Sequence, residues 1–386
     1  MNKFSQFCKK EIVFCIAACA AIITCFFVKP SSEYLKYIDW NTLALLFSLM
    51  TVVAGLRRCD VFDRLGSFLI SKVKSIRSLC AVFVFLCFFL SMFITNDVSL
   101  ITFVPFSISV LLSTEVPGTQ IMYTVVLQTV AANVGSMLTP IGNPQNLFLF
   151  SKMNVSLASF IKILLPYTII SFVLLVVSLF LVPKGNRNKE ISLNSNETKI
   201  TYKKQSGATT GLTVVYLVLF VTSILSVLGV FPKWIAALAT LILVGIVDRK
   251  TFFDVDYMLL LTFVAFFIFT GNIQHLSIIK QMLERVVQNH ECIAAIITSQ
   301  IISNVPAALL LYPFSKNVEG LLCGVDIGGL GTLVASLASL ISFKIYTENI
   351  HGQKTGKLPS TMHYLGVFTL VNILFLAVMV AWYCFA

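Results

Sequence analysis

Long apolar stretches separated by short polar segments run through the whole chain. A helix needs about 20 apolar residues to cross a bilayer, and stretches near that length recur from end to end. In two other segments, 60–77 and 276–287, apolar residues recur at helical spacing among charged ones, which predicts amphipathic helices on the membrane surface. The pattern predicts an all-α polytopic membrane protein with about nine full spans, at residues 11–28, 38–55, 119–150, 159–182, 211–230, 234–247, 257–271, 321–343 and 361–382.

Two further apolar regions are interrupted by a polar tip that occurs twice. Residues 95–107 read TNDVSLITFVPFS and residues 303–315 read SNVPAALLLYPFS, so Asn96 matches Asn304, and Pro-Phe-Ser begins nine residues after each Asn. Each arm of the first region has about 15 residues, or ~22 Å of helix, which is short of the ~30 Å hydrocarbon core. We therefore predict two re-entrant hairpins, at about 79–112 and 290–315. Irregular backbone at that depth is tolerated only inside protein or beside a water-filled cavity.

Two of the predicted spans contain segments that would unwind a helix. Residues 132–146, in the third span, read ANVGSMLTPIGNPQN, and the glycines and prolines predict a break. Residues 328–340, in the eighth span, read GGLGTLVASLASL and predict a second break. Such breaks expose backbone carbonyls and half-helix ends beside polar side chains, here Asn133, Ser136, Thr139 and Asn143.

The order of hairpin and broken span recurs in the two halves, and Gly331-Thr332 aligns with Gly135-Ser136. An odd number of spans precedes the second repeat, so it is inverted relative to the first. With a cytoplasmic N-terminus, twenty of the 28 Lys and Arg residues lie inside, as the positive-inside rule requires. Two inverted-topology repeats are typical of secondary transporters. The predicted units are a first repeat over 1–182, a basic cytoplasmic linker over 183–209, a linking span over 210–230 and a second repeat over 231–386.

The amino-acid composition also indicates the class of protein. The chain is 57% hydrophobic and only 12% charged, unlike a soluble domain. Its net charge of +11 lies in short basic clusters between apolar runs, which indicates membrane topology and no nucleic-acid partner. The ten cysteines include no Cys-x-x-Cys pair, so neither a disulfide framework nor a zinc site is predicted. The expected partner is the lipid bilayer of a plasma or inner membrane, with the C-terminus outside.

One carboxylate lies inside an apolar region. An Asp at the centre of a spanning helix costs ~3 kcal/mol, so Asp97 is a candidate functional residue. It either completes a cation site or carries a coupling proton, and the structural alternative is a cap for backbone N–H groups at the tip. Asp326, just before the second break, is interpreted as a residue at the end of a span or in a vestibule.

The tips and the two breaks resemble those of the ion transporter superfamily, which comprises arsenite permeases, sodium–proton antiporters and divalent-anion–sodium symporters. Asn96-Asp97 at the first tip is most similar to the arsenite-permease-like anion permeases, because the dicarboxylate branch has Ser-Asn-Thr at both tips. The resemblance implies a site for ions and solute at the tips and breaks. The residues it implicates are Thr95, Asn96, Asp97, Asn133, Ser136, Thr139, Gly142 and Asn143, with Ser303, Asn304, Thr332, Ser336 and Ser339. The sodium sites it implies use Thr95, Asn96, Thr139 and Asn143 in the first repeat, and Ser303, Asn304, Thr332 and Ser336 in the second.

The leading hypothesis is secondary active, ion-coupled transport of a small anionic or neutral oxyacid, such as arsenite or a carboxylate, by alternating access. A sodium–proton antiporter on the same fold is the alternative. An intramembrane enzyme is a distant third, because the sequence holds no paired aspartates, His-Glu-x-x-His motif or Asp-rich cluster. No resident cofactor is expected besides sodium ions or protons as coupling ions, and a homodimer is left open.

Overall fold

The computed structural model describes Phe7 and residues 11–73, 75–114, 116–181, 210–352 and 358–385, with backbone alone at 351 and 352. In these ranges all regular structure is helical. Seven of the helices are long and apolar enough to cross a membrane, and several shorter apolar helices accompany them. The chain is therefore an all-helical, multi-pass membrane protein. The predicted linker over 183–209 lies outside the described residues.

The helices follow the apolar stretches of the sequence, and each predicted break falls between two of them. In chain order the helices are α2 Ile12–Cys25, α3 Tyr34–Tyr37, α4 Trp40–Arg58, α5 Val61–Ile70, α6 Ile76–Ile94, α7 Asn96–Ser113, α8 Gly118–Ser136, α9 Pro144–Met153, α10 Leu157–Leu181, α11 Thr210–Val227, α12 Lys233–Val247, η1 Arg249–Asp254, α13 Tyr257–His275, α14 Ser277–Val287, α15 Glu291–Ile302, α16 Asn304–Leu311, η2 Tyr312–Phe314, α17 Val318–Ile327, η3 Leu333–Ala335, α18 Leu337–Gly352 and α19 Thr361–Phe385.

The first hairpin differs from its prediction in length. Its arms, α6 and α7, have 19 and 18 residues, and both are among the seven helices long enough to span. Both helices begin before the first residue of their apolar stretch: α6 begins at Ile76 and α7 at Asn96. Ser75 caps α6 through Ser78 N, and the tip interrupts the helix only at Thr95. The arms of the second hairpin, α15 and α16, are short, with 12 and 8 residues.

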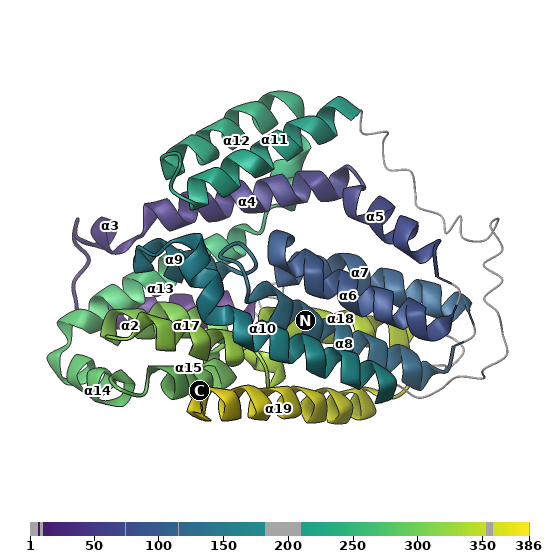
Figure 1. Cartoon of the computed structure of the whole chain (residues 1–386). Helices are drawn as coiled ribbons and strands as arrows, with labels where there is room; N and C mark the ends of the chain where they lie inside the picture. Colours follow the sequence, from purple (N-terminus) through teal and green to yellow (C-terminus); the bar gives the residue numbers. More distant parts are fainter. Residues whose placement is uncertain are drawn as a thin grey trace.

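One layer of the protein consists of α4, α11 and α12, which Figure 1 shows apart from the helices that carry the tips. Both α11 and α12 pack along α4. The buried Ser48 hydroxyl of α4 lies 2.7 Å from Ser223 Oγ of α11 and 2.9 Å from Thr240 Oγ1 of α12. Hydrogen bonds between side chains help to hold helices together where lipid provides no hydrophobic drive. The three helices therefore form a unit with its own polar core.

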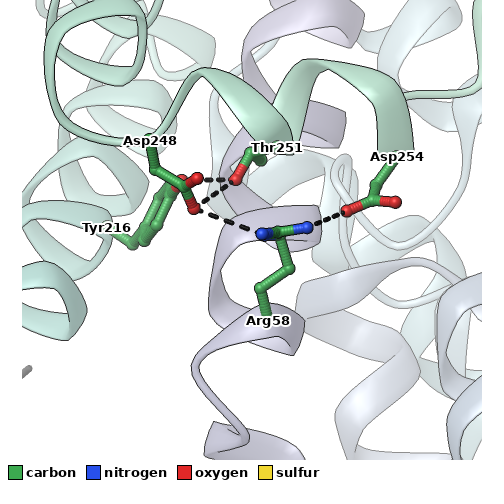
Figure 2. A network of polar contacts seen from close by, with 5 residues as sticks. All are labelled: Arg58, Tyr216, Asp248, Thr251 and Asp254. Carbon is green, nitrogen blue, oxygen red and sulfur yellow. Dashed lines mark hydrogen bonds and ion pairs between the residues drawn. The ribbon is translucent and has the colours of Figure 1, made fainter. Parts of the chain in front are cut away.

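A charged network fastens η1 to the end of α4 and to α11 (Figure 2). Arg58 Nε lies 3.3 Å from Asp248 Oδ2, and Arg58 Nη1 lies 2.9 Å from Asp254 Oδ2. The same Asp248 oxygen accepts hydrogen bonds from Thr251 Oγ1 at 2.8 Å and from Tyr216 Oη at 3.3 Å. The planar Arg fork thus bridges two carboxylates from one short helix. The network stabilises this layer and lies on helices other than those of the two tips.

The second group of helices packs around α8, which is buried along most of its length. The hairpin arms α6 and α7 both lie against α8, and α18 of the second half packs on α7 and α8. Gly135 is the point of closest approach: a Cβ there would meet the backbone carbonyl of Phe88 and would lie 2.7 Å from Ser91 Oγ. Helices of both halves therefore interlock near the two breaks.

Candidate functional site

The two tips have the same backbone conformation. Thr95 has φ +69° and ψ 149°, and Ser303 has φ +77° and ψ 154°. Positive φ is rare for a side chain with a Cβ, and strained residues of this kind cluster at functional sites. In both tips the next residue is Asn, whose Oδ1 accepts the backbone N–H of the residue that follows it, at 3.0 Å in each case. Asn96 and Asn304 therefore begin α7 and α16 in the same way.

Each tip is held by the unwound segment of its own repeat. Asn96 N donates to Gly142 O at 3.1 Å, and the Thr139 hydroxyl donates to the Met92 carbonyl. In the second repeat the Thr332 hydroxyl donates to Gln300 O at 3.2 Å. Met92 and Gln300 each lie three residues before their tip, so Thr139 and Thr332 make the same contact.

This equivalence corrects the alignment expected from the sequence. Thr139 follows Gly135 by four residues, and Thr332 follows Gly328 by four. A Cβ at Gly328 would lie 2.7 Å from Ser299 Oγ, as one at Gly135 would from Ser91 Oγ. Gly135 therefore corresponds to Gly328 and not to Gly331. The sequence alignment failed because both segments are rich in glycine and only the contacts distinguish one glycine from another.

The predicted site residues converge because eight helix ends meet there. The N-terminal ends of α7, α9, α16 and α18 lie at the tips and after the breaks, and the C-terminal ends of α6, α8, α15 and α17 lie before them. Helix N-termini carry partial positive charge and C-termini partial negative charge, so the backbone of this region offers both polarities.

Asn133 is the centre of the polar cluster, and it joins both halves of the chain. Its Oδ1 accepts from Asn96 Nδ2 at 3.1 Å and from Ser336 Oγ at 3.0 Å. Its Nδ2 donates to Ser339 Oγ at 3.2 Å and to Gly329 O at 3.4 Å. All of these partners apart from Asn96 belong to the second half of the chain, so this one side chain is hydrogen-bonded to both copies.

A second branch of the cluster contains a carboxylate that the sequence analysis left out of the site. Asp326 lies in the last turn of α17, where the break begins, and it does not line an open vestibule, because it is only 2% exposed. Its Oδ1 accepts from Asn143 Nδ2 and from Gln145 Nε2, both at 3.3 Å. Asn143 in turn donates to Ser136 Oγ at 3.3 Å, which connects this branch to Asn133. Asp326 and Gln145 were missed, although a carboxylate inside an apolar run is the same signal that identified Asp97.

The remaining predicted residues lie at the margins of the cluster. Asp97 Oδ1 is buried and has no hydrogen-bond partner among the described residues. Ser303 Oγ reaches only Ala335 O, at 3.5 Å, and Thr332 is exposed. A Cβ at Gly142 would meet the Ser136 carbonyl, so this position requires glycine. The structure thus groups Asn96, Asn133, Ser136, Asn143, Ser336 and Ser339, and it places Thr95, Asp97, Thr139, Ser303, Asn304 and Thr332 around them.

The predicted sodium sites have a donor set that suits the ion, since hydroxyl, amide and carbonyl oxygens are hard neutral ligands. Several of these oxygens already serve the fold. Asn143 Oδ1 accepts Asn146 N at 2.9 Å as the cap of α9, and Ser336 Oγ donates to Asn133. The second lone pairs of these oxygens are the part that could bind a cation.

Comparison with known proteins places this site in a family context. The sequence profile of the citrate transporter family matches residues 8–320. The chain is 34% identical over 318 residues to Uncharacterized transporter MJ0456 of Methanocaldococcus jannaschii, covering 82% of this chain and 84% of that protein. It is 31% identical over 316 residues to Inner membrane protein YbiR of Escherichia coli, covering 81% of each. A shorter match, 30% identical over 148 residues, joins 38% of this chain to 30% of Silicon efflux transporter LSI3 of Oryza sativa. These matches confirm the resemblance to the ion transporter superfamily.

Proposed function

The chain belongs to the citrate transporter family, and from this premise we propose that it is a secondary active transporter for a small anionic or neutral oxyacid, driven by a sodium or proton gradient. The observation that carries the proposal is the cluster in which Asn133 is hydrogen-bonded to Asn96 of one repeat and to Ser336 and Ser339 of the other. A solute bound at such a junction touches both repeats. Relative movement of the repeats then opens the pocket to one side of the membrane at a time.

In the membrane, we place the α6–α7 and α15–α16 pairs as re-entrant hairpins that enter from opposite faces, within two inverted repeats. The N-terminus is cytoplasmic and the C-terminus lies outside. The matching conformations of Thr95 and Ser303 support a duplicated unit. The buried side chains of Asn96 and Asn304 support tips that lie inside protein rather than in water.

The solute chemistry follows from the groups around the cluster. Four helix N-termini and the amides of Asn96 and Asn133 favour oxygen atoms with partial or full negative charge. None of the residues of the cluster is Lys or Arg, so no bidentate contact to a dianion is available there. A small oxyacid with one or no charge fits this arrangement. The name of one relative, a silicon efflux transporter, agrees with an oxyacid of low charge, whereas citrate, a polyanion near neutral pH, would need the positive charge of bound cations.

We assign the solute contacts to the tip residues Asn96 and Asn304, with Asn133, Ser336 and Ser339. Coupling sodium ions would be held by Thr95, Asn96, Thr139 and Asn143 and by Ser303, Asn304, Thr332 and Ser336. A bound sodium ion supplies positive charge beside an anionic solute. The tip residues orient the solute oxygens, and the packed helices around α8 exclude bulk water from them.

The test is uptake into proteoliposomes. Radiolabelled arsenite, citrate and germanic acid (as an analogue of silicic acid) are offered under an imposed sodium or proton gradient. We expect at least one to accumulate, to stop accumulating when the gradient is dissipated, and to accumulate at least tenfold more slowly with Asn133→Ala. Gly211→Ala, at a position with nothing near its Cβ, is the matched control. Accumulation of no oxyacid, with correctly inserted protein, would refute the proposal.

A sodium–proton antiporter is the second candidate, and the buried Asp97 oxygen without a partner is the observation that favours it. The same vesicles distinguish the two. In an antiporter, a sodium gradient moves protons in the absence of any oxyacid, and Asp97→Asn abolishes this movement. In the oxyacid transporter, ion movement requires the solute.

A further inference from the structure

Three buried oxygen atoms around Asp326 have no hydrogen-bond partner within the described part of the chain. They are Asp326 Oδ2, Gln145 Oε1 and Asn146 Oδ1. Gln145 donates to the other oxygen of the same carboxylate, and the Asn146 side chain adjoins that carboxylate as well. A buried oxygen that loses its hydrogen bonds to water costs free energy unless another group replaces them. Three such acceptors on side chains that adjoin one another indicate that something with positive charge belongs among them.

The orientation of the two amides is set by their nitrogens. Asn146 Nδ2 donates to Met137 O at 3.0 Å and to Thr139 O at 3.4 Å, and Gln145 Nε2 donates to Asp326 Oδ1. Rotating either amide would place its oxygen against another oxygen. In this orientation Gln145 Oε1 and Asn146 Oδ1 accept no hydrogen bond from the described residues.

The neighbouring asparagines provide the contrast. Asn96 Oδ1 and Asn304 Oδ1 at the tips, and Asn143 Oδ1 at the first break, each accept a backbone N–H. These oxygens are satisfied by the protein alone. The group around Asp326 is not, even though it lies next to Asn143 and none of its three side chains is more than 2% exposed.

The charge around Asp326 also needs compensation. No Lys or Arg among the described residues forms an ion pair with Asp326. The carboxylate lies in the last turn of α17, whose C-terminal end adds partial negative charge. The start of α9 and the donors Asn143 and Gln145 offset part of this at Oδ1. The Asn146 side chain adjoins the carboxylate, and Oδ2 still has no hydrogen-bond partner among the described residues.

We propose that Asp326, Gln145 and Asn146 form a binding site for one sodium ion, separate from the tips and adjacent to Asn143. One carboxylate oxygen and two amide oxygens are hard ligands of the kind that sodium accepts, and one negative charge matches one positive charge. A single cation contacts all three oxygens at once. A proton on Asp326 Oδ2 would serve fewer of them, because one O–H reaches one acceptor. Since the site couples ion binding to the junction between the repeats, its role in transport rests on the proposed function.

The experiment measures sodium binding without transport. Purified full-length protein in detergent is unfolded by heat in increasing NaCl, with choline chloride keeping the ionic strength constant. Because a ligand that binds the folded state raises its stability, we expect sodium to raise the Tm by about 3 °C at saturation. Asp326→Asn removes most of that rise. Glu319→Gln, which removes an exposed carboxylate from the same helix, keeps it.

A second variant protects the test against a folding defect. Gln145→Met keeps Asp326 and the size of the side chain but removes one oxygen, so half-maximal stabilisation should need about tenfold more sodium. Sodium curves of Asp326→Asn and Gln145→Met that both coincide with wild type would overturn the proposal, as would the absence of any sodium effect in wild type. Either result leaves solute accumulation in proteoliposomes unaffected, so failure of this inference and failure of the proposed function are read separately.

Discussion

The two copies of the tip and break share a backbone and differ in where their charge lies. Thr95 matches Ser303, Asn96 matches Asn304, and Thr139 matches Thr332 in the contact each makes. In this register Asn133 and Asp326 occupy the same position, two residues before the glycine of close approach. After the tip the order is reversed, since the first copy has Asp97 where the second has Val305.

The difference shows how two segments with the same backbone can carry different functional groups. The shared backbone depends on main-chain contacts and small residues, which are present in both segments. The carboxylates can differ because they make none of these contacts. In the first copy the neutral Asn133 is fully hydrogen-bonded across the repeats, while in the second copy Asp326 has an oxygen left over. At this matched position one half of the chain therefore provides the link between the halves and the other provides a buried carboxylate.

The largest expected effect is a loss of stability at the matched glycines. Gly135→Ala places a methyl group against the backbone carbonyl of Phe88, whereas Gly328→Ala meets the Gly324 carbonyl and Ser299 Oγ at 2.7 Å. Overpacking costs about 1–3 kcal/mol, and we expect Gly135→Ala near the top of that range and Gly328→Ala nearer the bottom. Thermal unfolding in detergent measures both. Gly211→Ala has open space and should be neutral, so equal Tm values for all three would contradict the packing argument.

Replacing the neutral Asn133 by Asp, the residue type at the matched position 326, should also lower the stability of the folded protein. Asn133→Asp removes the donors to Ser339 Oγ and Gly329 O and adds a second buried carboxylate near Asp326. We expect a loss of about 2–3 kcal/mol in the free energy of unfolding. Asn317→Asp is the control, because this exposed side chain caps α17 through Gly320 N and Asp caps equally well. A stable Asn133→Asp protein would mean that Asn133 is not fully used as a donor.

The two helices that follow the breaks, α9 and α18, are anchored by different contacts. An ion pair holds α9 and stacked aromatic rings hold α18, so we expect the stability to depend on pH only through the contact of α9. At the far end of α9, Lys152 Nζ lies 2.7 Å from Asp39 Oδ2, while α18 is held by Tyr346 stacked on Tyr364 with ring centroids 4.4 Å apart. Burial alone would raise the pKa of Asp39, but Lys152 and the Thr42 N–H outweigh it and lower the pKa below its ordinary value. A lowered pKa stabilises the folded state above the unfolded pKa, and this stabilisation is lost as the pH falls through the folded pKa.

We therefore expect Asp39→Asn to cost about 1 kcal/mol at pH 7, and the difference from wild type to shrink below the ordinary Asp pKa of about 3.9. Unfolding in detergent as a function of pH checks this. Glu33→Gln, an exposed carboxylate nearby, should show no such trend. A penalty for Asp39→Asn that stays constant down to pH 3 would argue against the ion pair.

The smallest expected change in stability is at Asp97. Its Oδ1 has no hydrogen-bond partner among the residues that the structure describes, so Asp97→Asn should keep the Tm or raise it slightly, with a change below about 0.5 kcal/mol. Transport or ion exchange in proteoliposomes should change far more than stability, as for a functional carboxylate. A drop of several degrees in Tm without a change in transport would instead identify Asp97 as a structural cap.

Much of the architecture could be predicted from the apolar pattern. The spans predicted at 38–55, 159–182 and 257–271 became α4, α10 and α13, because a continuous apolar run in lipid has to form a helix. Both tips fell where the repeated Asn predicts them. The arms of the first hairpin are longer than predicted, because hydrogen bonds at Ser75 and Asn96 extend the helices beyond the apolar residues.

The chain by itself determined that this protein lies in a membrane, that it contains a duplicated polar tip and a break in each half, and which family it resembles. These follow from hydrophobic length, helix-breaking residues and the repeated Asn, all of which are local. Only the tertiary structure decided which glycine matches which, that Asn133 joins the two halves of the chain, and that Asp326, at the end of α17, is buried beside Gln145 and Asn146. Those facts depend on contacts between segments almost two hundred residues apart, and no local pattern encodes the hydrogen bond that a side chain will find across such a distance.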